Sequence, residues 1–394
     1  MKILFVTPVV PSQTDGRRPF NFIKYLAPKH TIHLICLRLP QQSPATIRDL
    51  LEMRIAVTAV DIAPYRSYLS CLRGFVERQP LQVSWCRSPE LRHALERTLA
   101  RESFDLVHID RMRMGQYAPG IRIPKVIDCT DSLVMYFERS LPYRRSWGER
   151  FVDRWELSTY PRFEQYALRH VDAAVVCSPI DADVFRKHHP DKAFEVIENA
   201  VDAEQFMPRS HGNGHTPRCV MTGTLFYFPN IDAGRYYAEE ILPLIRKTFP
   251  GLETRIIGSR PKREVSALDG RWGMQVLADV PRMEEHLFQD DIYLCPIRVA
   301  TGIRNKLLEA MAAGMPIVTT ALGAEGLDLK PEHEALFAEI PDQFREQVER
   351  LMNSPELRQT LGQNARRYVL EKHNIEIVGA KLERLYERLV ATGG

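Results

Sequence analysis

RVATGIRNKLLEAMAAGMPIVTT, residues 298–320, predicts a loop, a helix and a strand, in that order. The helix is expected to begin at Gly302 and to end at Gly314, which would take the C′ position. The small residues of AMAAGM allow such a helix to pack closely on a sheet. A helix followed directly by an apolar strand is typical of an α/β protein with a parallel sheet.

The start of this predicted helix has the features of an anion-binding site. A helix that begins with glycine leaves its backbone N–H groups accessible, and the positive end of the helix dipole lies there. Lys306 adds a mobile cation, and Arg298 can bind phosphate oxygens with its forked guanidinium. One charge-assisted hydrogen bond contributes about 1.5–3 kcal/mol, so two or three would hold a diphosphate.

Glu309 needs a different explanation, because a carboxylate repels phosphate. It follows Thr301 by eight residues and Asn305 by four, which predicts that the three side chains lie on a similar side of the helix. A carboxylate there can accept two hydrogen bonds from a vicinal diol such as that of a ribose. The alternative is a solvated pair of Lys306 and Glu309 worth a few tenths of a kcal/mol, and these two residues alone slightly favour it.

Apolar runs alternate with helical patterns along the whole chain, as they do in residues 298–320. Patterns such as 20–27 and 90–100 predict helices. The expected fold is therefore α/β, with two doubly wound Rossmann-like domains that face each other across a cleft. The runs predict buried strands at 2–6, 32–37, 55–62, 105–109, 125–129, 173–177, 219–223, 253–258, 274–278, 291–296, 316–320 and 335–340.

A polar segment with glycine and histidine, residues 209–217, separates the two sets of strands and has the composition of a linker. A chain of 394 residues also exceeds the roughly 250–300 residues at which single cores stop growing. We therefore expect a first domain at 1–205, a linker at 206–217, a second domain at 218–372 and a C-terminal helical segment at 373–394.

The composition excludes several classes of protein. A net charge of +3 gives no reason to expect a nucleic-acid partner, and no apolar run approaches the roughly 18–20 residues that span a bilayer. Seven cysteines without a CxxC pair, and no signal peptide, indicate a reduced cytoplasmic protein. GxSxG, GxGxxG and HExxH are absent, and the DAD at 181–183 is better explained as a helix start, so no metal or cofactor is expected.

Four segments together resemble family 4 glycosyltransferases, the large retaining group with the GT-B fold. GIRNKLLEAMAAGMPIVTTALGAEGL is similar to the donor-binding motif of that family, and VIENAVDAEQFMP (196–208) is similar to its hinge segment. TGTLFYFPNIDAGRYYAEEILPLI (222–245) resembles a subset of bacterial members, and the N-terminal strand, glycine loop and first helix also match. The resemblance implies a domain at 1–205 on the acceptor side, a nucleotide-sugar-binding domain at 218–372, and a C-terminal helix that crosses back to the first domain.

The resemblance also implies roles for individual residues. Glu309 would hold the ribose of a nucleotide sugar, Arg298 and Lys306 would act on the diphosphate, and Gly16 would approach the donor from the first domain. The remaining residues implied in donor binding are Gly223, Asn230, Thr301, Gly302, Ile303, Arg304 and Asn305.

Two positions depart from the family pattern. Thr301 stands where the family usually has a second glutamate, and the family's N-domain histidine is absent near VIDCTDSL (126–133). Asp131, which follows the strand end, is the residue that we expect to meet the acceptor or the donor sugar. Lys306 and Arg298 are expected to act on the phosphates, with Arg260 or Lys262 as further candidates.

Two segments, 65–87 and 137–156, are both basic and aromatic. They suggest peripheral contact with the inner membrane surface, although an ordinary surface helix is the more common explanation of such a pattern.

The expected activity is transfer of a hexose-type unit from a nucleotide-diphosphate sugar to an acceptor hydroxyl, with retention and without a metal. Bacterial surface polysaccharide or glycoconjugate assembly is the setting that the resemblance implies, with a lipid-linked or oligosaccharide acceptor. Two alternatives stay open at this point: a non-hydrolysing sugar-nucleotide 2-epimerase, and a catalytically impaired subunit that only binds nucleotide sugar.

Overall fold

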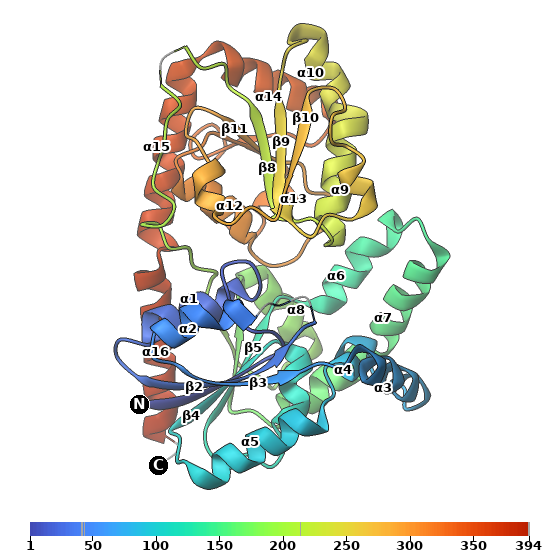
Figure 1. Cartoon of the computed structure of the whole chain (residues 1–394), viewed down its shortest axis with the longest axis vertical. Coiled ribbons are helices and arrows are strands. Elements are labelled where there is room, and N and C mark those ends of the chain that lie inside the picture. The colour runs from blue at the N-terminus through green and yellow to red at the C-terminus, as the bar shows by residue number, and fades with distance from the viewer. Residues whose placement is uncertain (41, 43, 213, 393–394) are drawn as a thin grey trace. The chain divides into compact units, whose positions relative to one another are not determined.

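A computed structural model describes residues 1–40, 42, 44–212 and 214–392 of the chain. The chain divides into two compact units, which are described separately below. Unit 1 contains Met1–Glu198 and Val378–Gly394, and unit 2 contains Asn199–Ile377. Each unit is built around one parallel sheet with helices on its faces, which confirms the predicted Rossmann-like α/β class (Figure 1).

The sheet of unit 1 has seven parallel strands in the order β3-β2-β1-β4-β5-β6-β7. Its strands are β1 (Lys2–Thr7), β2 (Thr31–Arg38), β3 (Ala56–Asp61), β4 (Leu106–Asp110), β5 (Lys125–Thr130), β6 (Ala173–Val176) and β7 (Phe194–Val196). The order reverses between β1 and β4, so the carboxyl ends of these two strands border the crevice where such sheets bind ligands. The three-residue β7 was missed in the sequence because a run so short shows no periodicity.

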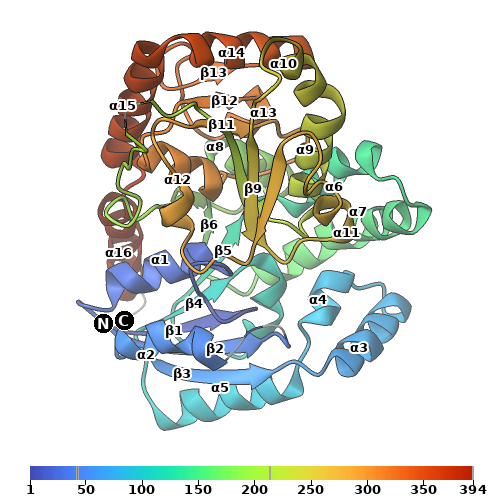
Figure 2. The same cartoon turned by 45° about the horizontal axis from the view of Figure 1, so that its top comes forward.

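The helices of unit 1 connect these strands. They are α1 (Arg17–Leu26), α2 (Arg48–Glu52), α3 (Pro64–Val76), α4 (Leu81–Trp85), α5 (Pro89–Arg101), α6 (Leu133–Ser140), α7 (Trp147–Leu168) and α8 (Pro179–His188), with 3₁₀ turns at Pro44–Ile47, Met112–Tyr117 and Leu141–Tyr143. The long connection from β3 to β4 contains α3, α4 and α5. Figures 1 and 2 show α3, α4 and α7 at the edge of unit 1 that lies away from α16 (Ile375–Thr392).

The sheet of unit 2 has six parallel strands in the order β10-β9-β8-β11-β12-β13 (Figure 2). Its strands are β8 (Cys219–Thr224), β9 (Thr254–Ser259), β10 (Met274–Ala278), β11 (Ile292–Cys295), β12 (Ile317–Thr319) and β13 (Leu336–Phe337). Its helices are α9 (Phe228–Tyr236), α10 (Leu242–Thr248), α11 (Arg263–Ser266), α12 (Asn305–Ala312), α13 (Ala321–Ala324), α14 (Pro341–Asn353) and α15 (Pro355–Lys372), with a π-helical turn at Tyr237–Ile241 and a 3₁₀ turn at Met283–His286. Here the order reverses between β8 and β11.

Burial explains why the strands could be recognised from apolar runs. The residues of β1 from Ile3 to Val6 are fully buried, because helices cover both faces of the sheet. The same holds for β11 in unit 2. All seven cysteines are free thiols, and six of them are buried.

The helix predicted from Gly302 begins three residues later than expected. α12 starts at Asn305 with Arg304 as its N-cap residue, while Gly302 belongs to the preceding loop and has a φ of 69°. The end was predicted correctly: Gly314 follows the C-cap Ala313 with a φ of 71°, and its N–H donates to Met311 O. A positive φ cannot belong to a right-handed helix, so Gly302 lies within the loop instead of starting the helix.

The last helix belongs largely to unit 1. Residue Gly379 packs so closely on the ring of Tyr25 that a Cβ there would overlap the ring. The Tyr25 hydroxyl donates to Glu383 Oε2 at 2.8 Å, and the Tyr386 hydroxyl lies 2.6 Å from His108 Nδ1 inside the sheet core. These contacts make residues 378–392 part of the unit 1 core. The boundaries predicted at 205, 217 and 372 stay a proposal for how the chain divides by function.

Candidate functional site

The carboxyl ends of β8 and β11 in unit 2 bring together three residues that the sequence singled out. Gly223 is the fifth residue of β8, and a Cβ on it would lie 2.5 Å from Nδ2 of Asn230 in α9. The Asn230 amide donates to Thr224 O at 2.9 Å, and its Oδ1 accepts from Lys306 Nζ at 2.7 Å. Only glycine at position 223 leaves room for this side chain.

Lys306 is a cation that burial disfavours. Desolvation lowers its pKa, because the side chain lies largely inside unit 2, and Arg304 adds repulsion. Among the residues that the structure describes, no carboxylate forms an ion pair with Lys306. A partly buried ammonium without a counter-charge lies at the switch point of a parallel sheet, where anionic ligands of such folds bind.

Arg298, which follows β11, is oriented by acidic and aromatic neighbours. Its guanidinium donates to both carboxylate oxygens of Asp232, at 3.0 and 2.8 Å, and lies 3.6 Å from Glu240. It also sits 4.1 Å above the ring of Tyr236. Asp232 is a partner that the sequence did not single out, although a carboxylate two residues after Asn230 on the same helix was a visible signal.

The loop before α12 is held from two sides. Ile303 O accepts from Asn199 Nδ2 at 2.7 Å, and the Arg304 guanidinium donates to Glu325 O. Gly302, Ile303 and Arg304 are buried, whereas Thr301 and Asn305 are half-buried. Gly302, Ile303 and Arg304 therefore form a buried, anchored loop directly before the first turn of α12, which carries Lys306.

Glu309 lies one turn into α12 and is 4% exposed. Because the helix begins at Asn305, Thr301 does not share a helix face with Glu309 as the sequence predicted; Asn305 and Glu309 do, one turn apart. Glu309 follows Lys306 by three residues on the same helix, which is a separation of about one turn.

Unit 1 contributes Gly16 and Asp131 to the predicted set. Gly16 is the N-cap residue of α1 with a φ of 64°, and a Cβ on it would come within 3.0 Å of Val9. Asp131 follows β5, is half-buried, and donates its N–H to Cys129 O. The preceding Thr130 has a φ of 65°, a strained conformation for a β-branched residue.

Two further groups at the carboxyl edge of this sheet were missed in the sequence. Arg18 is buried and donates to Asp128 Oδ2 at 2.7 Å and to Glu198 O at 2.9 Å. Asp110 ends β4 and is 1% exposed, and burial raises its pKa to about 6. Within the described residues neither Asp110 oxygen accepts a hydrogen bond, and Arg111 Nε lies 3.9 Å away. An aspartate that ends the apolar run DLVHID was the available signal.

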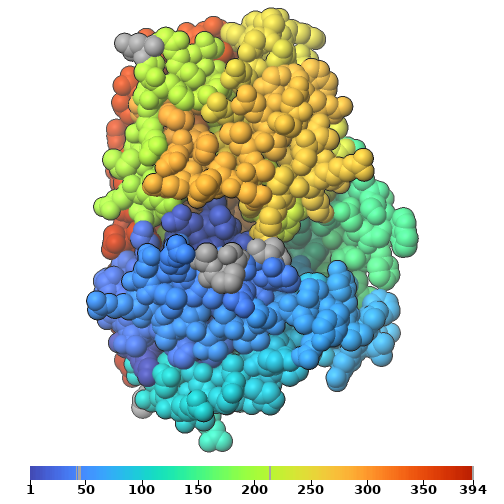
Figure 3. Space-filling model, viewed as in Figure 1, coloured from blue at the N-terminus to red at the C-terminus, as the bar shows by residue number. Residues whose placement is uncertain are grey.

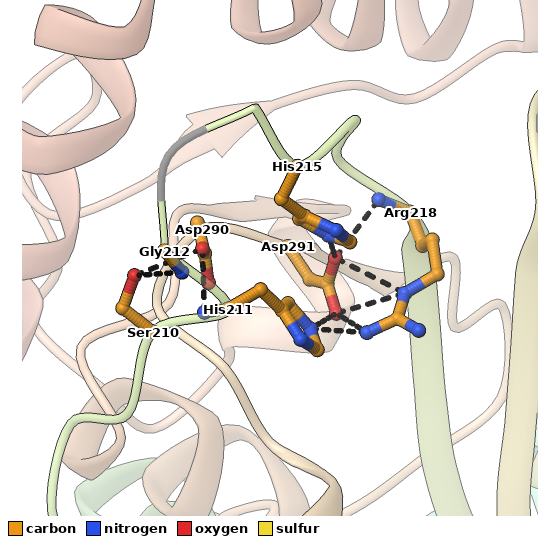
Figure 4. A network of polar contacts seen from close by, with 7 residues as sticks. All are labelled: Ser210, His211, Gly212, His215, Arg218, Asp290 and Asp291. Atoms are coloured by element: carbon orange, nitrogen blue, oxygen red, sulfur yellow. Dashed lines mark hydrogen bonds and ion pairs between the residues drawn. The ribbon is translucent and has the colours of Figure 1, made fainter.

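One cluster in unit 2 has the composition of a metal site (Figure 4). His211 and His215 place Nε2 atoms 3.2 and 2.8 Å from the two oxygens of buried Asp291. The guanidinium of Arg218 binds the same carboxylate at 2.9 Å and also contacts His211. Arg218 already supplies a positive charge at this carboxylate. The contacts of His211 and His215 with Asp291 join the linker to the amino ends of β8 and β11, opposite the edge that carries Lys306.

The predicted DAD segment also has a structural role. Asp181 is fully buried, accepts a hydrogen bond from Ser132 N at 3.0 Å, and contacts Ser178, the N-cap residue of its own helix.

No helix in the described part of the chain is long and apolar enough to cross a membrane.

Comparisons with known proteins give family matches to both halves of the chain. Residues 16–205 match the family described as Glycosyltransferase Family 4, and residues 216–354 match the one described as Glycosyl transferases group 1. A curated relative, phosphatidyl-myo-inositol mannosyltransferase from Propionibacterium freudenreichii, is 37% identical over 171 residues, which is 42% of each chain. The matched segments span less than half the length of the curated relatives.

Solved structures with the same fold cover almost the entire chain. Sucrose-phosphate synthase from Thermosynechococcus elongatus aligns with a TM-score of 0.71 at 14% identity, covering 100% of both chains. HepE from Anabaena, in complex with UDP and glucose, aligns with a TM-score of 0.70 at 13% identity, covering 98% of this chain and 99% of that one.

Proposed function

The chain belongs to the family 4, or group 1, glycosyltransferases, and from this premise we propose that it transfers a sugar from a nucleotide-diphosphate sugar to an acceptor hydroxyl with retention of configuration. The observation that carries the proposal is the partly buried Lys306, held by Asn230 at 2.7 Å and without a carboxylate partner among the described residues. A ligand that brings phosphate oxygens to this ammonium would supply its missing counter-charge.

In the proposed complex, the diphosphate lies against the loop 300–304 and Lys306. Gly302 has no side chain that could block the approach, and Arg298 would supply a second cation once its pairing with Asp232 is shared with phosphate. Glu309 would accept hydrogen bonds from the two ribose hydroxyls, as the family resemblance implies. Its burial favours a hydrogen-bonded carboxylate over a solvated one.

Catalysis then depends on charge stabilisation and orientation. As the bond between the sugar and the diphosphate breaks, negative charge accumulates on the leaving group, and Lys306 and Arg298 would neutralise it. The leaving diphosphate can take the proton of the acceptor hydroxyl, so the proposal requires no separate enzymic base. Asp131 and Gly16, in unit 1, would meet the sugar or the acceptor.

We propose a hexose as the transferred unit. Two comparisons support a hexose: HepE was solved with UDP and glucose, and the matched curated relative is a mannosyltransferase. The acceptor would be a lipid-linked or oligosaccharide hydroxyl in bacterial surface polysaccharide or glycoconjugate assembly, on the cytoplasmic side.

The central test compares two lysines of unit 2. Lys306→Ala should lower kcat/KM by about 10²–10³-fold, the effect of removing one group that stabilises developing charge. Lys262→Ala, at an exposed position after β9, should leave kcat/KM nearly unchanged. Transfer is measured as release of nucleoside diphosphate with a panel of nucleotide sugars, and equal losses in both variants would remove Lys306 from its assigned role.

The same panel separates the two alternative functions. A 2-epimerase would isomerise the donor without any acceptor, and a binding subunit would bind a nucleotide sugar without releasing diphosphate. Release that depends on the acceptor supports the transferase and rejects both.

A further inference from the structure

Helix α3 has its large apolar residues on the outside. Its small residues Ser67 and Gly74 are buried instead, and a Cβ on Gly74 would overlap the Ser84 hydroxyl of α4. A surface helix normally buries its large apolar face. Six large apolar residues, spaced at three and four positions along one helix face, are between 43% and 83% exposed: Tyr65, Tyr68, Leu69, Leu72, Phe75 and Val76.

The first turns of α7 extend this surface. Trp147 is 84% exposed, and Phe151 and Val152 are about half exposed. Phe75 of α3 stacks on Trp155 of α7 with ring centroids 4.2 Å apart and lies 6.2 Å from Phe151, so the two helices form one continuous surface. We call these exposed residues of α3 and α7 the apolar ridge. Figure 3 shows both segments, in blue and in blue-green, at the outer edge of unit 1.

A cationic cavity of about 830 Å³ begins where α3 ends. Glu77 is the one carboxylate among its described lining residues, and it pairs with Arg73 at 2.6 Å and Arg87 at 3.0 Å. For the other three arginines, the described residues offer no carboxylate partner. Five arginines line the cavity: Arg73, Arg78, Arg87, Arg92 and Arg162.

The ridge and the cavity share α3 and its C-terminal end, since Arg73 and Arg78 alternate in sequence with Leu72, Phe75 and Val76. Guanidinium groups bind phosphate oxygens in pairs, and tryptophan and tyrosine favour the interface between water and lipid. A bilayer with anionic headgroups offers both an apolar layer for the ridge and phosphate groups for the arginines.

We propose that unit 1 docks on a membrane of anionic phospholipid, with the apolar ridge in the interface and a lipid phosphate in the arginine cavity. The inference goes beyond the transfer reaction and does not depend on it. Its test needs no nucleotide sugar and no acceptor, so it can fail while the proposed transferase activity stands.

The test is vesicle flotation of the full chain. Vesicles of phosphatidylcholine alone are compared with vesicles that contain equal parts of phosphatidylcholine and phosphatidylglycerol, at low and at high salt. The protein should float with the anionic vesicles at low salt, and less of it should float as salt screens the arginines. Failure to float with anionic vesicles at low salt overturns the proposal, and equal binding to both vesicle types overturns the role of the cavity.

Paired variants assign the two parts of the surface. Arg78→Gln with Arg162→Gln should lower the partition coefficient about 25-fold, at about fivefold per arginine near an anionic surface. Arg97→Gln with Arg101→Gln, at exposed positions of α5, is the matched control and should have a much smaller effect. An equal loss in both pairs would mean that binding depends only on net charge, and would reject the cavity.

The ridge is tested in the same way. Leu72→Glu should abolish flotation, while Ile340→Glu, at a position 54% exposed in unit 2, should leave it unchanged. Both positions are on the surface, so both variants should fold like the wild type. Circular dichroism and melting curves check this. A concentration-dependent dimer that Leu72→Glu disrupts, without flotation of the wild type, would show that the ridge binds a second copy and would overturn the membrane assignment.

Discussion

Lys306 and Asp110 both carry charge where burial opposes it, and neither has an oppositely charged side chain in hydrogen-bonding contact among the described residues. Such groups lower stability in the free protein, so their presence indicates a role that a purely structural side chain would not have. In unit 2, Lys306 is expected to bind a phosphate group of the ligand. In unit 1 the carboxylate ends the strand that borders the crevice of the sheet.

Lys306→Met should make the free protein more stable and remove its response to nucleotide. The lowered pKa of Lys306 means that the folded protein binds this proton less well than the unfolded chain does. Its charge therefore costs stability at every pH below the pKa of lysine in the unfolded chain, and the cost is complete below the folded pKa. Replacing it with an uncharged chain of similar length should raise the free energy of unfolding by on the order of 1 kcal/mol.

The measurement is thermal unfolding with and without UDP. UDP should raise the Tm of the wild type through binding to the folded state and should raise the Tm of Lys306→Met much less. An equal shift in both proteins would place the diphosphate away from Lys306.

Asp110→Asn should change how stability depends on pH. Burial raises the pKa of Asp110 from 3.8 to about 6, so the folded state holds this proton more tightly than the unfolded chain. The contribution of Asp110 to stability is therefore fully present below about pH 4 and falls as the pH rises to about 6. Above that range the variant should be more stable than the wild type by up to about 3 kcal/mol.

Urea unfolding between pH 4 and 8 measures this effect. Asp61→Asn is a control of opposite sign, because Arg38 lowers the pKa of Asp61 at the surface. If Asp110→Asn and the wild type show the same pH dependence, Asp110 is paired in solution by a group that the structure does not place there.

Single residues were predictable only where the sequence itself shows their special role. The αL conformation of Gly16 and the close approach at Gly223 follow from the absence of a side chain, and glycine is visible in sequence. The partner Asp232 of Arg298 and the buried pair of Arg18 and Asp128 join residues far apart in the chain. Such pairs depend on tertiary contacts that a single sequence does not display.

At the scale of elements, the predicted strands of both sheets are confirmed, and the errors are the missed β7 and the boundaries of other elements. The helix at 298–320 was placed three residues too early, because a glycine before a helical pattern was interpreted as its first residue. The left-handed conformation of Gly302 depends on how the loop is held by Asn199 and by Glu325 O. Those contacts come from segments before and after the helix, so the sequence around Gly302 alone could not predict its conformation.

The packing of α3 on α4 gives a prediction for one element. Gly74→Val should lower the free energy of unfolding by about 1–3 kcal/mol, since its side chain would overlap Ser84 at a buried contact. Gly148→Ala, near the start of α7, is the matched control: a Cβ there meets only Ser146 Oγ, at 3.6 Å. That variant should be neutral or slightly stabilising because alanine favours the helix. Chemical denaturation of both variants checks the difference, and equal stabilities would show that α3 is not held on α4.

At the scale of the whole molecule, the fold class was predictable because parallel sheets produce long apolar strands at regular intervals. The division of the chain was less visible. Composition pointed to residues 209–217 as a linker, whereas compactness separates the units at Glu198 and again at Val378. Composition records where a segment is polar, but it does not record which core a helix joins.

Gly379→Val should destabilise unit 1 although it lies near the C-terminus. The added atoms would displace α16 from the ring of Tyr25 and weaken the contact of Tyr386 with His108. Hydrogen exchange should then be faster for the amides of β1 and β4, with little change in unit 2. Arg384→Ala, at an exposed position of the same helix, should leave exchange as in the wild type; equal acceleration in both sheets would show that the two units unfold together.

The placement of Tyr386 against His108 has a consequence for how the protein is made. A ribosome delivers residues 1–198 long before it delivers the helix that completes their core. The first unit must therefore remain unfinished, with apolar surface open, while all of unit 2 is synthesised and can already fold. We expect nascent chains stopped before residue 378 to recruit chaperones through the N-terminal residues of unit 1, not through the more recently synthesised unit 2.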